Sequence, residues 1–583
     1  MGEPVGRWQA PPIRDYGMIG DTRTAGLTSR LGSIDWMCWP RFDSEPVFGR
    51  LVDHERGGCF EIAVEGVTHT ERRYRDRSTV LETTWESGTG RATLVEAMAM
   101  GTDSPTVVRR LSCDAGSVSV RVLHDPRPGL PGTHDEAPIA VSVSPPVSLR
   151  PGVPLHLLLR QGESLSTVLT DEDHPVPADR ATPLIDATDR WWRRWSRDIR
   201  SGEHYGDVLV RSLMNLRMLT YTPTGAPVAA PTTSLPEEIG GVRNWDYRFS
   251  WPRDASVGVA AFLAAGKKSE ACAFVDWLVK CACREEAPIR VLYDLYGERS
   301  MPEREVDGVS GYHGSLPVRV GNLAEEQHQL DVYGWVIDAL WNLTQADEKL
   351  SREGRRTLAE YADFVVDNWQ RPDAGLWEVR AEPAHSVHSK VWAWIALDRA
   401  ARTAAALGMS RRRAARWERE RDLLAEDVRR HGFSAERGCY VRAYGSDELD
   451  SALLLLPLTG FDMDGGRERV AETIDSIWKE LGAGGPLLYR YRVGHDGLPG
   501  REGAFLPCSF WLLEGLLRLG RREEGLRLFE EVLGIANELL LLPEEIDPST
   551  GAYLGNYPLA LSQVGLVHAV TEVQRVLDGP RAP

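Results

Sequence analysis

The sequence predicts a multidomain β + α fold, in which an antiparallel β-sandwich is followed by a domain built of helices. Three observations support this prediction. The chain has 583 residues, and a single hydrophobic core stops growing at about 250–300 residues, so more than one domain is expected. Short β-branched segments dominate up to about residue 185. Apolar residues recur at helical spacing from about residue 255 onward.

The N-terminal segments are short, β-branched and separated by Gly, Pro, Asp and Ser. The clearest alternation of polar and apolar side chains runs from Ser117 to Leu123 (SVSVRVL), and alternation with a period of two is typical of a half-buried strand. GCFEIAVEGV, TVLETTWES and RATLVEAMAM have the same character. Many short strands without intervening helices are typical of a sandwich. We therefore assign residues 1–185 to an N-terminal β-sandwich domain.

The sequence becomes helical and charged near Thr188, and residues 186–225 are expected to form a helical linker. Residues 226–583 form the predicted second domain, in which roughly eleven or twelve amphipathic segments lie between Ala255 and Asp578. Antiparallel pairs of so many helices can close into a ring whose loops surround a pocket at one end. A solenoid is the alternative architecture, but the repeat of roughly 30–45 residues that it requires is not visible.

Composition narrows the class of partner. The net charge is −17, from 85 acidic and 68 basic residues, which disfavours nucleic acid and anionic membranes but is compatible with a neutral ligand. The eight cysteines show no zinc-binding spacing. The N-terminus has no signal-peptide pattern, and no run of about 18 apolar residues occurs. We expect a cytoplasmic protein with reduced thiols; assembly into a homo-oligomer stays open.

Three loops of the helical half place carboxylates beside aromatic residues or glycine. They are residues 243–254 (RNWDYRFSWPRD), 373–380 (DAGLWEVR) and 543–551 (PEEIDPSTG). Aromatic rings stack on the apolar faces of a pyranose, and carboxylates and arginines bind its hydroxyls. Glycoside hydrolysis also needs one protonated and one ionised carboxyl. A glutamate beside a tryptophan is a candidate for the acid, although any single Glu is more often a solvated or capping residue.

The three loops resemble the active-site segments of glycoside hydrolase family 15, the family of bacterial glucoamylases and trehalase-like enzymes. Longer blocks follow in the same order between about residues 11 and 575, among them IRDYGMIGDTRTAGLTSRLGSIDWMCWPRFDSEPVFGRLVD, APTTSLPEEIGGVRNWDYRFSWPRDAS, PVRVGNLAEEQHQLDVYG, GLPGREGAFLPCSFWL and EEIDPSTGAYLGNYPLALS. The resemblance implies an antiparallel β-sandwich followed by a catalytic (α/α)6 barrel, a toroid of six helical hairpins, over residues 226–583. It also implies release of glucose from non-reducing α-glucosyl ends with inversion, without a metal or other cofactor.

The resemblance also implies roles for individual residues. Glu378 matches the general acid and Glu544 the general base, with Glu545 the next candidate for the base. Arg253 and Asp254 match the pair that grips the non-reducing glucose. The further expected substrate-binding residues are Tyr247, Trp251, Trp377 and Arg380. The Tyr247 hydroxyl is a candidate for holding the attacking water; the alternative for Tyr247 and Trp251 is packing in the core.

Several positions depart from the family pattern and put the leaving group in doubt. Val379 stands where starch-acting fungal members often have Glu, and Ala384 and Ser386 replace a larger Arg and Phe. Trp335 and Gln563 stand where Glu and His are common. Three hypotheses follow. The first is hydrolysis of a small α-glucoside, with trehalose the first candidate. The second is glucoamylase-like hydrolysis of maltose, isomaltose or short dextrins, and the third is a member repurposed to bind or remodel a glycosylated metabolite.

Overall fold

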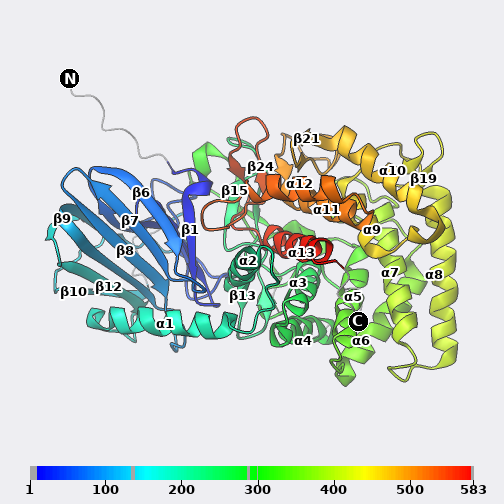
Figure 1. The fold of residues 1–583 in the computed structure, drawn as a ribbon, viewed down its shortest axis with the longest axis horizontal. Helices are drawn as coiled ribbons and strands as arrows, with labels where there is room; N and C mark the ends of the chain where they lie inside the picture. Colours follow the sequence, from blue (N-terminus) through cyan, green and yellow to red (C-terminus); the bar gives the residue numbers. More distant parts are fainter. Residues whose placement is uncertain (1–9, 133–137, 285–288, 299, 580–583) are drawn as a thin grey trace.

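The computed structural model describes residues 10–132, 138–284, 289–298 and 300–579 (Figure 1). A β-sandwich forms one end of the molecule, and a ring of helices forms the other. The strands of the sandwich are β1 Tyr16–Gly20, β2 Ala25–Ser29, β3 Ser33–Cys38, β4 Pro46–Phe48, β5 Cys59–Val64, β6 Val67–Tyr74, β7 Leu81–Ser87, β8 Gly90–Met98, β9 Val107–Asp125, β10 Ile139–Ser144, β11 Leu155–Arg160 and β12 Ser164–Asp171.

Strand β9 joins the two layers of the sandwich. Its first part pairs with β8 and β12, and its last part pairs with β5 and β11, all antiparallel. One layer therefore has the order β1-β2-β3-β5-β9, and β9-β8-β7-β6 continues as the other. Val118, Val120 and Val122 are buried, while the residues between them are at least partly exposed. This burial explains the alternation in the sequence, because successive side chains of a strand face opposite sides.

Helices occupy the rest of the chain. They are α1 Ala181–Ser196, α2 Gly206–Met218, α3 Pro252–Ala264, α4 Lys268–Arg284, α5 Asp331–Gln345, α6 Arg352–Asn368, α7 Val387–Thr403, α8 Arg411–His431, α9 Leu456–Thr459, α10 Met463–Leu481, α11 Leu506–Arg518, α12 Arg522–Leu533 and α13 Ala560–Leu577. Helices α3, α5, α7, α9, α11 and α13 contact one another in sequence, and α13 returns to α3, so they close an inner ring. Together with the outer helices this is the (α/α)6 arrangement that the resemblance implies.

The segment expected to be a linker divides between the two parts of the molecule. Helix α1 covers a face of the sandwich, where Ala181 and Ile185 pack on Ala97, Val108 and Val168. Helix α2 instead packs against α13 and completes the outer layer of the ring. The domain boundaries inferred from the sequence remain predictions.

The connections at the two ends of the ring differ in length. Residues 265–267 join α3 to α4, and residues 519–521 join α11 to α12. The connections that lead into inner helices are long; residues 219–251, 369–386 and 534–559 are three of them. Because inner helices alternate with outer ones, all the long connections lie at the same end of the ring. The three loops rich in carboxylates belong to these connections.

These long connections also carry small two- and three-stranded sheets. Their strands are β13 Thr220–Tyr221, β14 Ala226–Pro227, β15 Thr233–Pro236, β16 Asn244–Asp246, β17 Arg304–Val306, β18 Val318–Val320, β19 Phe433–Ser434, β20 Cys439–Tyr440, β21 Gly482–Gly484, β22 Leu487–Leu488, β23 Ala504–Phe505, β24 Glu545–Ile546 and β25 Tyr553–Leu554. The sheet β23-β24-β25 ties the loop before α11 to the loop before α13. Backbone hydrogen bonds therefore fix the loops against one another.

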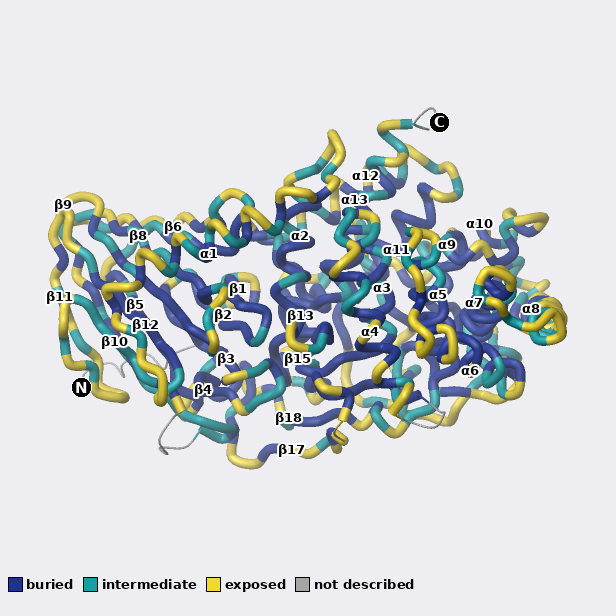
Figure 2. The backbone as a smooth tube through the Cα atoms, turned by 90° about the horizontal axis from the view of Figure 1, so that it is seen from below, coloured by how far each residue is buried: buried dark blue, intermediate teal, exposed yellow. Residues whose placement is uncertain are grey.

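The sandwich is fastened to this loop end of the ring. The Tyr557 hydroxyl donates a 2.8 Å hydrogen bond to the Tyr16 carbonyl, and the Trp36 indole donates one of 2.7 Å to the Pro231 carbonyl. One cluster of buried hydrophobic residues runs from the strands into the ring, and Figure 2 shows buried segments in both parts of the molecule. The sandwich thus packs against the loops that carry the candidate site.

Within the described part of the chain, no helix is both long and apolar enough to cross a membrane.

Candidate active site

A cavity of about 560 Å³ lies among the long loops. It brings together seven of the residues singled out in the sequence, although Tyr247 and Glu544 are separated by 297 positions. The sequence did not single out Arg490, Phe505 and Trp511, which also line the cavity. The lining consists of Ala229, Tyr247, Trp251, Arg253, Asp254, Leu376, Trp377, Glu378, Arg490, Phe505, Trp511, Glu544, Leu559 and Leu561. The mixture of aromatic, charged and small apolar groups suits a sugar ring.

Glu378 follows Trp377 in the loop before α7. Its backbone has φ of 58°, a left-handed conformation that is costly for a residue other than glycine. The Gln327 side-chain amide holds the Glu378 carbonyl at 3.1 Å. In the side chain, Oε1 accepts a 2.7 Å hydrogen bond from the Trp251 indole and lies 3.6 Å from an Arg253 nitrogen. Burial raises the pKa of Glu378 in spite of the nearby positive charge of Arg253.

Glu544 is fully buried in the loop between α12 and α13. Its Oε1 accepts a 2.7 Å hydrogen bond from the Tyr247 hydroxyl, and its Oε2 accepts one of 2.9 Å from the backbone N–H of Asn556. Gly555 turns the chain directly beside the carboxylate with φ of 72°, and a Cβ there would collide with Oε2. Burial, and then the negative charge of Glu237, raise the pKa of Glu544 to about 8.

Glu545 points away from this cavity. Adjacent side chains of an extended segment face opposite sides, and Glu545 begins strand β24. Its carboxylate accepts a 2.7 Å hydrogen bond from the Gly503 backbone N–H and lies 3.1 Å from Arg490. Glu545 is absent from the cavity lining, whereas Glu544 belongs to it. The structure therefore separates two neighbouring glutamates that the sequence could not tell apart.

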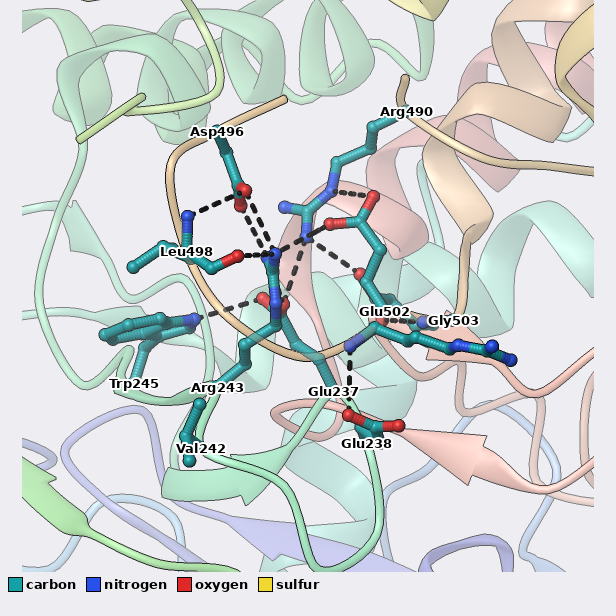
Figure 3. A network of polar contacts seen from close by, with 12 residues as sticks. Glu237, Glu238, Val242, Arg243, Trp245, Arg490, Asp496, Leu498, Glu502 and Gly503 are labelled. Atoms are coloured by element: carbon teal, nitrogen blue, oxygen red, sulfur yellow. Dashed lines mark hydrogen bonds and ion pairs between the residues drawn. The ribbon is translucent and has the colours of Figure 1, made fainter. Parts of the chain in front are cut away.

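Behind the cavity lies a buried network of charges, drawn in part in Figure 3. One Arg490 nitrogen contacts Glu502 at 2.7 Å, Glu545 at 3.1 Å and Glu237 at 3.2 Å. Arg243 pairs with Glu502 at 3.3 Å and with Asp496. Arg243 and Glu237 belong to the same loop. Glu237, Glu502 and Glu545 are close enough to hold a metal ion, but the Arg490 guanidinium already takes the position between them. Four carboxylates against two arginines leave negative charge beside Glu544.

Arg253 and Asp254 begin helix α3 at the wall of the cavity. The Arg253 Nε and the Asp254 Oδ1 lie 3.5 Å apart, and neither atom makes a hydrogen bond to any residue that the structure describes. Buried polar atoms usually have partners, so atoms without one at a cavity are ready to bind a ligand. Burial raises the pKa of Asp254. Sugar hydroxyls, which both donate and accept, match this pair.

Arg380 lies in a neighbouring cavity of about 450 Å³, which shares Tyr247, Trp377, Glu378 and Arg490 with the first. Its guanidinium packs on one side of the Trp245 ring at 4.5 Å and pairs with Glu303 at 2.6 Å. Arg380 is therefore outside the cavity that holds the two candidate catalytic carboxyls. Val379, Ala384 and Ser386 line a third cavity of about 500 Å³, which Trp377 also borders.

A barrel of paired helices with two carboxyls in an aromatic pocket has the groups that glycoside hydrolysis needs. The chain belongs to the glycosyl hydrolases family 15, whose model matches residues 203–571. A model described as the trehalase-like N-terminal domain matches residues 5–156. These matches confirm the family, the fold class and the enzyme class expected from the sequence.

Several curated relatives align over nearly the whole chain. A trehalase of Mycobacterium tuberculosis is 35% identical over 97% of this chain and 90% of its own length. The trehalase of Mycolicibacterium smegmatis is 35% identical over 98% and 92%, and that of Thermoplasma volcanium is 33% identical over 97% and 94%. A solved bacterial glucoamylase complexed with acarbose superposes with a TM-score of 0.73 at 14% identity, covering 100% of this chain and 97% of its own. That structure supports the fold alone.

Proposed function

We propose that this protein hydrolyses trehalose with inversion, using Glu378 as the general acid and Glu544 as the general base. The observation that carries the proposal is that one cavity holds both carboxyls, each fixed by a 2.7 Å hydrogen bond from a different aromatic side chain. The substrate follows from the relatives, because the three compared above are all named trehalases.

In the proposed reaction, Glu378 gives its proton to the oxygen that links the two glucose units. The bond between this oxygen and the anomeric carbon breaks, and water attacks that carbon from the opposite face. Glu544 takes the proton of this water. The Tyr247 hydroxyl, which bonds Glu544, lies where it orients the base and the water together. The products of trehalose are one β-glucose, from the attacked ring, and one α-glucose, from the leaving ring.

We place the attacked glucose against Arg253 and Asp254, which line the first cavity. The leaving glucose would occupy the neighbouring cavity, which Trp245 and Arg380 line and where the Arg380 guanidinium packs on the Trp245 ring. Trp377 and Glu378 border both cavities. The acid therefore stands at the junction where the bond between the two rings must lie. Arg380 is assigned to the leaving ring rather than to the attacked one.

A panel of trehalose, maltose, isomaltose and maltotriose tests the proposal through glucose release. We expect trehalose to give the highest kcat/KM; a preference for maltose or isomaltose would instead support the glucoamylase-like hypothesis. The Glu378→Gln and Glu544→Gln variants should each lose about 10²–10⁴-fold in kcat. Activity on none of the four sugars would support a member repurposed for another glycosylated molecule.

Proton NMR of the fresh products tests the stereochemistry. Inversion gives equal amounts of α- and β-glucose from trehalose before mutarotation, whereas retention gives α-glucose alone. Initial release of α-glucose alone would reject the inverting mechanism.

A further inference from the structure

A further cavity, here called the axial cavity, runs along the axis of the helical ring. It is distinct from the cavity that holds Glu378 and Glu544, which is called the catalytic cavity below. The volume of the axial cavity is about 1360 Å³, and residues from all six inner helices line it, from Ser256 on α3 to Thr571 on α13. It begins beneath the catalytic cavity and extends toward the short connections at the other end. Arg253, Leu376, Trp511 and Leu561 line both cavities and so form the partition between them.

The axial cavity offers flat aromatic surfaces. Four tryptophans line it, namely Trp335, Trp341, Trp392 and Trp511, and the rings of Trp335 and Trp392 are stacked. Trp335 is one of the positions at which the sequence departs from its family pattern. Broad apolar surfaces inside a ring of helices would usually be filled by other side chains, because protein interiors are closely packed. Here the four tryptophans instead border a space larger than the catalytic cavity.

The charged side chains of the cavity largely neutralise one another. Arg399 pairs with Asp338 at 3.0 Å, and Arg518 pairs with Glu572. His568 is neutral, because burial lowers its pKa to about 4. A cavity with compensated charges does not favour an ion of either sign. These surroundings therefore favour an uncharged ligand.

Glu514 on α11 is a polar group of this cavity without a partner among the described residues. Its residue is only 4% exposed, it lines the axial cavity, and no described residue donates a hydrogen bond to its carboxyl. Burial raises the pKa of Glu514 well above its ordinary value, and a carboxyl that holds its proton can both donate and accept hydrogen bonds. The Trp392 indole N–H also lacks a partner among the described residues. Buried polar groups are rarely left unsatisfied, so this pair points to a ligand.

We propose that the axial cavity is a second binding site, for a neutral polyhydroxylated molecule of monosaccharide size that stacks on its tryptophans and bonds Glu514. This site is separate from the catalytic cavity, and the proposal does not depend on which glycoside the enzyme hydrolyses. Because Arg253 borders both cavities, a ligand in the axial site contacts the partition on which the attacked glucose would rest.

The test uses the full chain and glucose as the probe. Asp254→Ala weakens glucose binding in the catalytic cavity, so titration calorimetry of this variant reports mainly the axial site. We expect binding of about one glucose with a dissociation constant in the millimolar range, and a crystal soaked in glucose should show the sugar beside Glu514. Trehalose hydrolysis is not part of this readout, so failure of the proposed function and failure of this inference are distinguishable.

Matched variants locate the site. In the Asp254→Ala background, Glu514→Leu removes the hydrogen bonds at similar volume and should weaken glucose binding by about tenfold or more. Glu514→Gln keeps a donor and an acceptor and should retain most of the affinity. Loss of fold is not expected from Glu514→Leu, because a buried polar group without a partner destabilises a protein. Trp341→Ala should also weaken binding, while Trp478→Ala, on the outer helix α10, should not.

Three results would overturn the inference. The first is calorimetry that shows no glucose binding to the Asp254→Ala chain, with only water in the axial cavity of the soaked crystal. The second is binding that is unchanged in Glu514→Leu and Trp341→Ala. The third is a preference for glucose 6-phosphate over glucose, because the compensated charges of the cavity require a neutral ligand.

Discussion

The rings of Tyr247 and Trp251 meet edge to face, with their centroids 5.5 Å apart. Each side chain donates a hydrogen bond to one of the two candidate catalytic carboxyls. The Tyr247 hydroxyl donates to Glu544, and the Trp251 indole donates to Glu378. The aromatic contact therefore joins the two side chains that hold the two carboxyls. An inverting pair must lie about 6.5–9.5 Å apart to admit a water molecule. We expect this contact to set the spacing that inversion requires.

Replacing Tyr247 by Phe should lower kcat with little change in KM. The ring keeps its contact with Trp251, but Glu544 loses the hydroxyl that holds Oε1. A hydrogen bond to a charged group contributes about 1.5–3 kcal/mol, which corresponds to a loss of about 10–100-fold. Steady-state kinetics on trehalose measures the effect. An unchanged kcat would show that the hydroxyl does not act on the base.

Replacing Glu237 by Gln should move the acidic limb of the pH profile of kcat/KM to lower pH. This limb reports ionisation of the base in the free enzyme, and the charge of Glu237 helps to raise the pKa of Glu544 to about 8. Without that charge Glu544 ionises at lower pH. Glu238→Gln, at the adjacent position, is the matched control. A limb that stays in place in Glu237→Gln would mean that another group controls it.

The Glu544→Gln variant should be more stable than the wild type at neutral and higher pH. The pKa of Glu544 is about 8 when folded and about 4.3 when unfolded, so the folded state binds more protons between these values. Stability of the wild type therefore falls as the pH rises from about 4.3 to 8, while that of the variant is less affected. We expect a difference of about 1–4 kcal/mol at pH 8, vanishing near pH 4.

Thermal unfolding across this pH range measures that difference. Glu238→Gln serves again as the control and should follow the wild type. A Glu544→Gln variant whose stability parallels the wild type at every pH would contradict the raised pKa.

Longer maltodextrins should not be better substrates than maltose. Val379, Ala384 and Ser386 contribute only the Ser386 hydroxyl to the cavity that they line, so they offer few polar contacts to further glucose units. The measurement is kcat/KM for the series from maltose to maltoheptaose. A steady rise with chain length would show that the cavity binds additional rings in spite of these small side chains.

The sequence predicted most of the candidate site because its residues lie in short blocks. Residues 243–254 alone supply Tyr247, Trp251, Arg253 and Asp254 to the cavity. Phe505 and Trp511 lie in GLPGREGAFLPCSFWL, a block that carried the family resemblance, yet nothing in its letters marked them as cavity residues.

Arg490 escaped prediction for a different reason. It sits in LLYRYRVG, where no pattern separates it from a surface arginine. Its role depends on Glu237, Glu502 and Glu545, which only the folded loops bring around it. The position of α2 in the ring could not be predicted from the sequence for the same reason. Its amphipathic pattern predicted a helix, but the contact with α13 that places it in the ring joins distant parts of the chain.

The bond between Tyr557 and Tyr16 bears on how the enzyme matures during synthesis. The cavity lacks Glu544, Leu559 and Leu561 until translation has passed residue 561. Ribosomes add about 5–20 residues each second. The sandwich is therefore synthesised many seconds before Tyr557, which it contacts in the folded protein. The lining of this cavity is therefore complete only when the last segment has closed the ring.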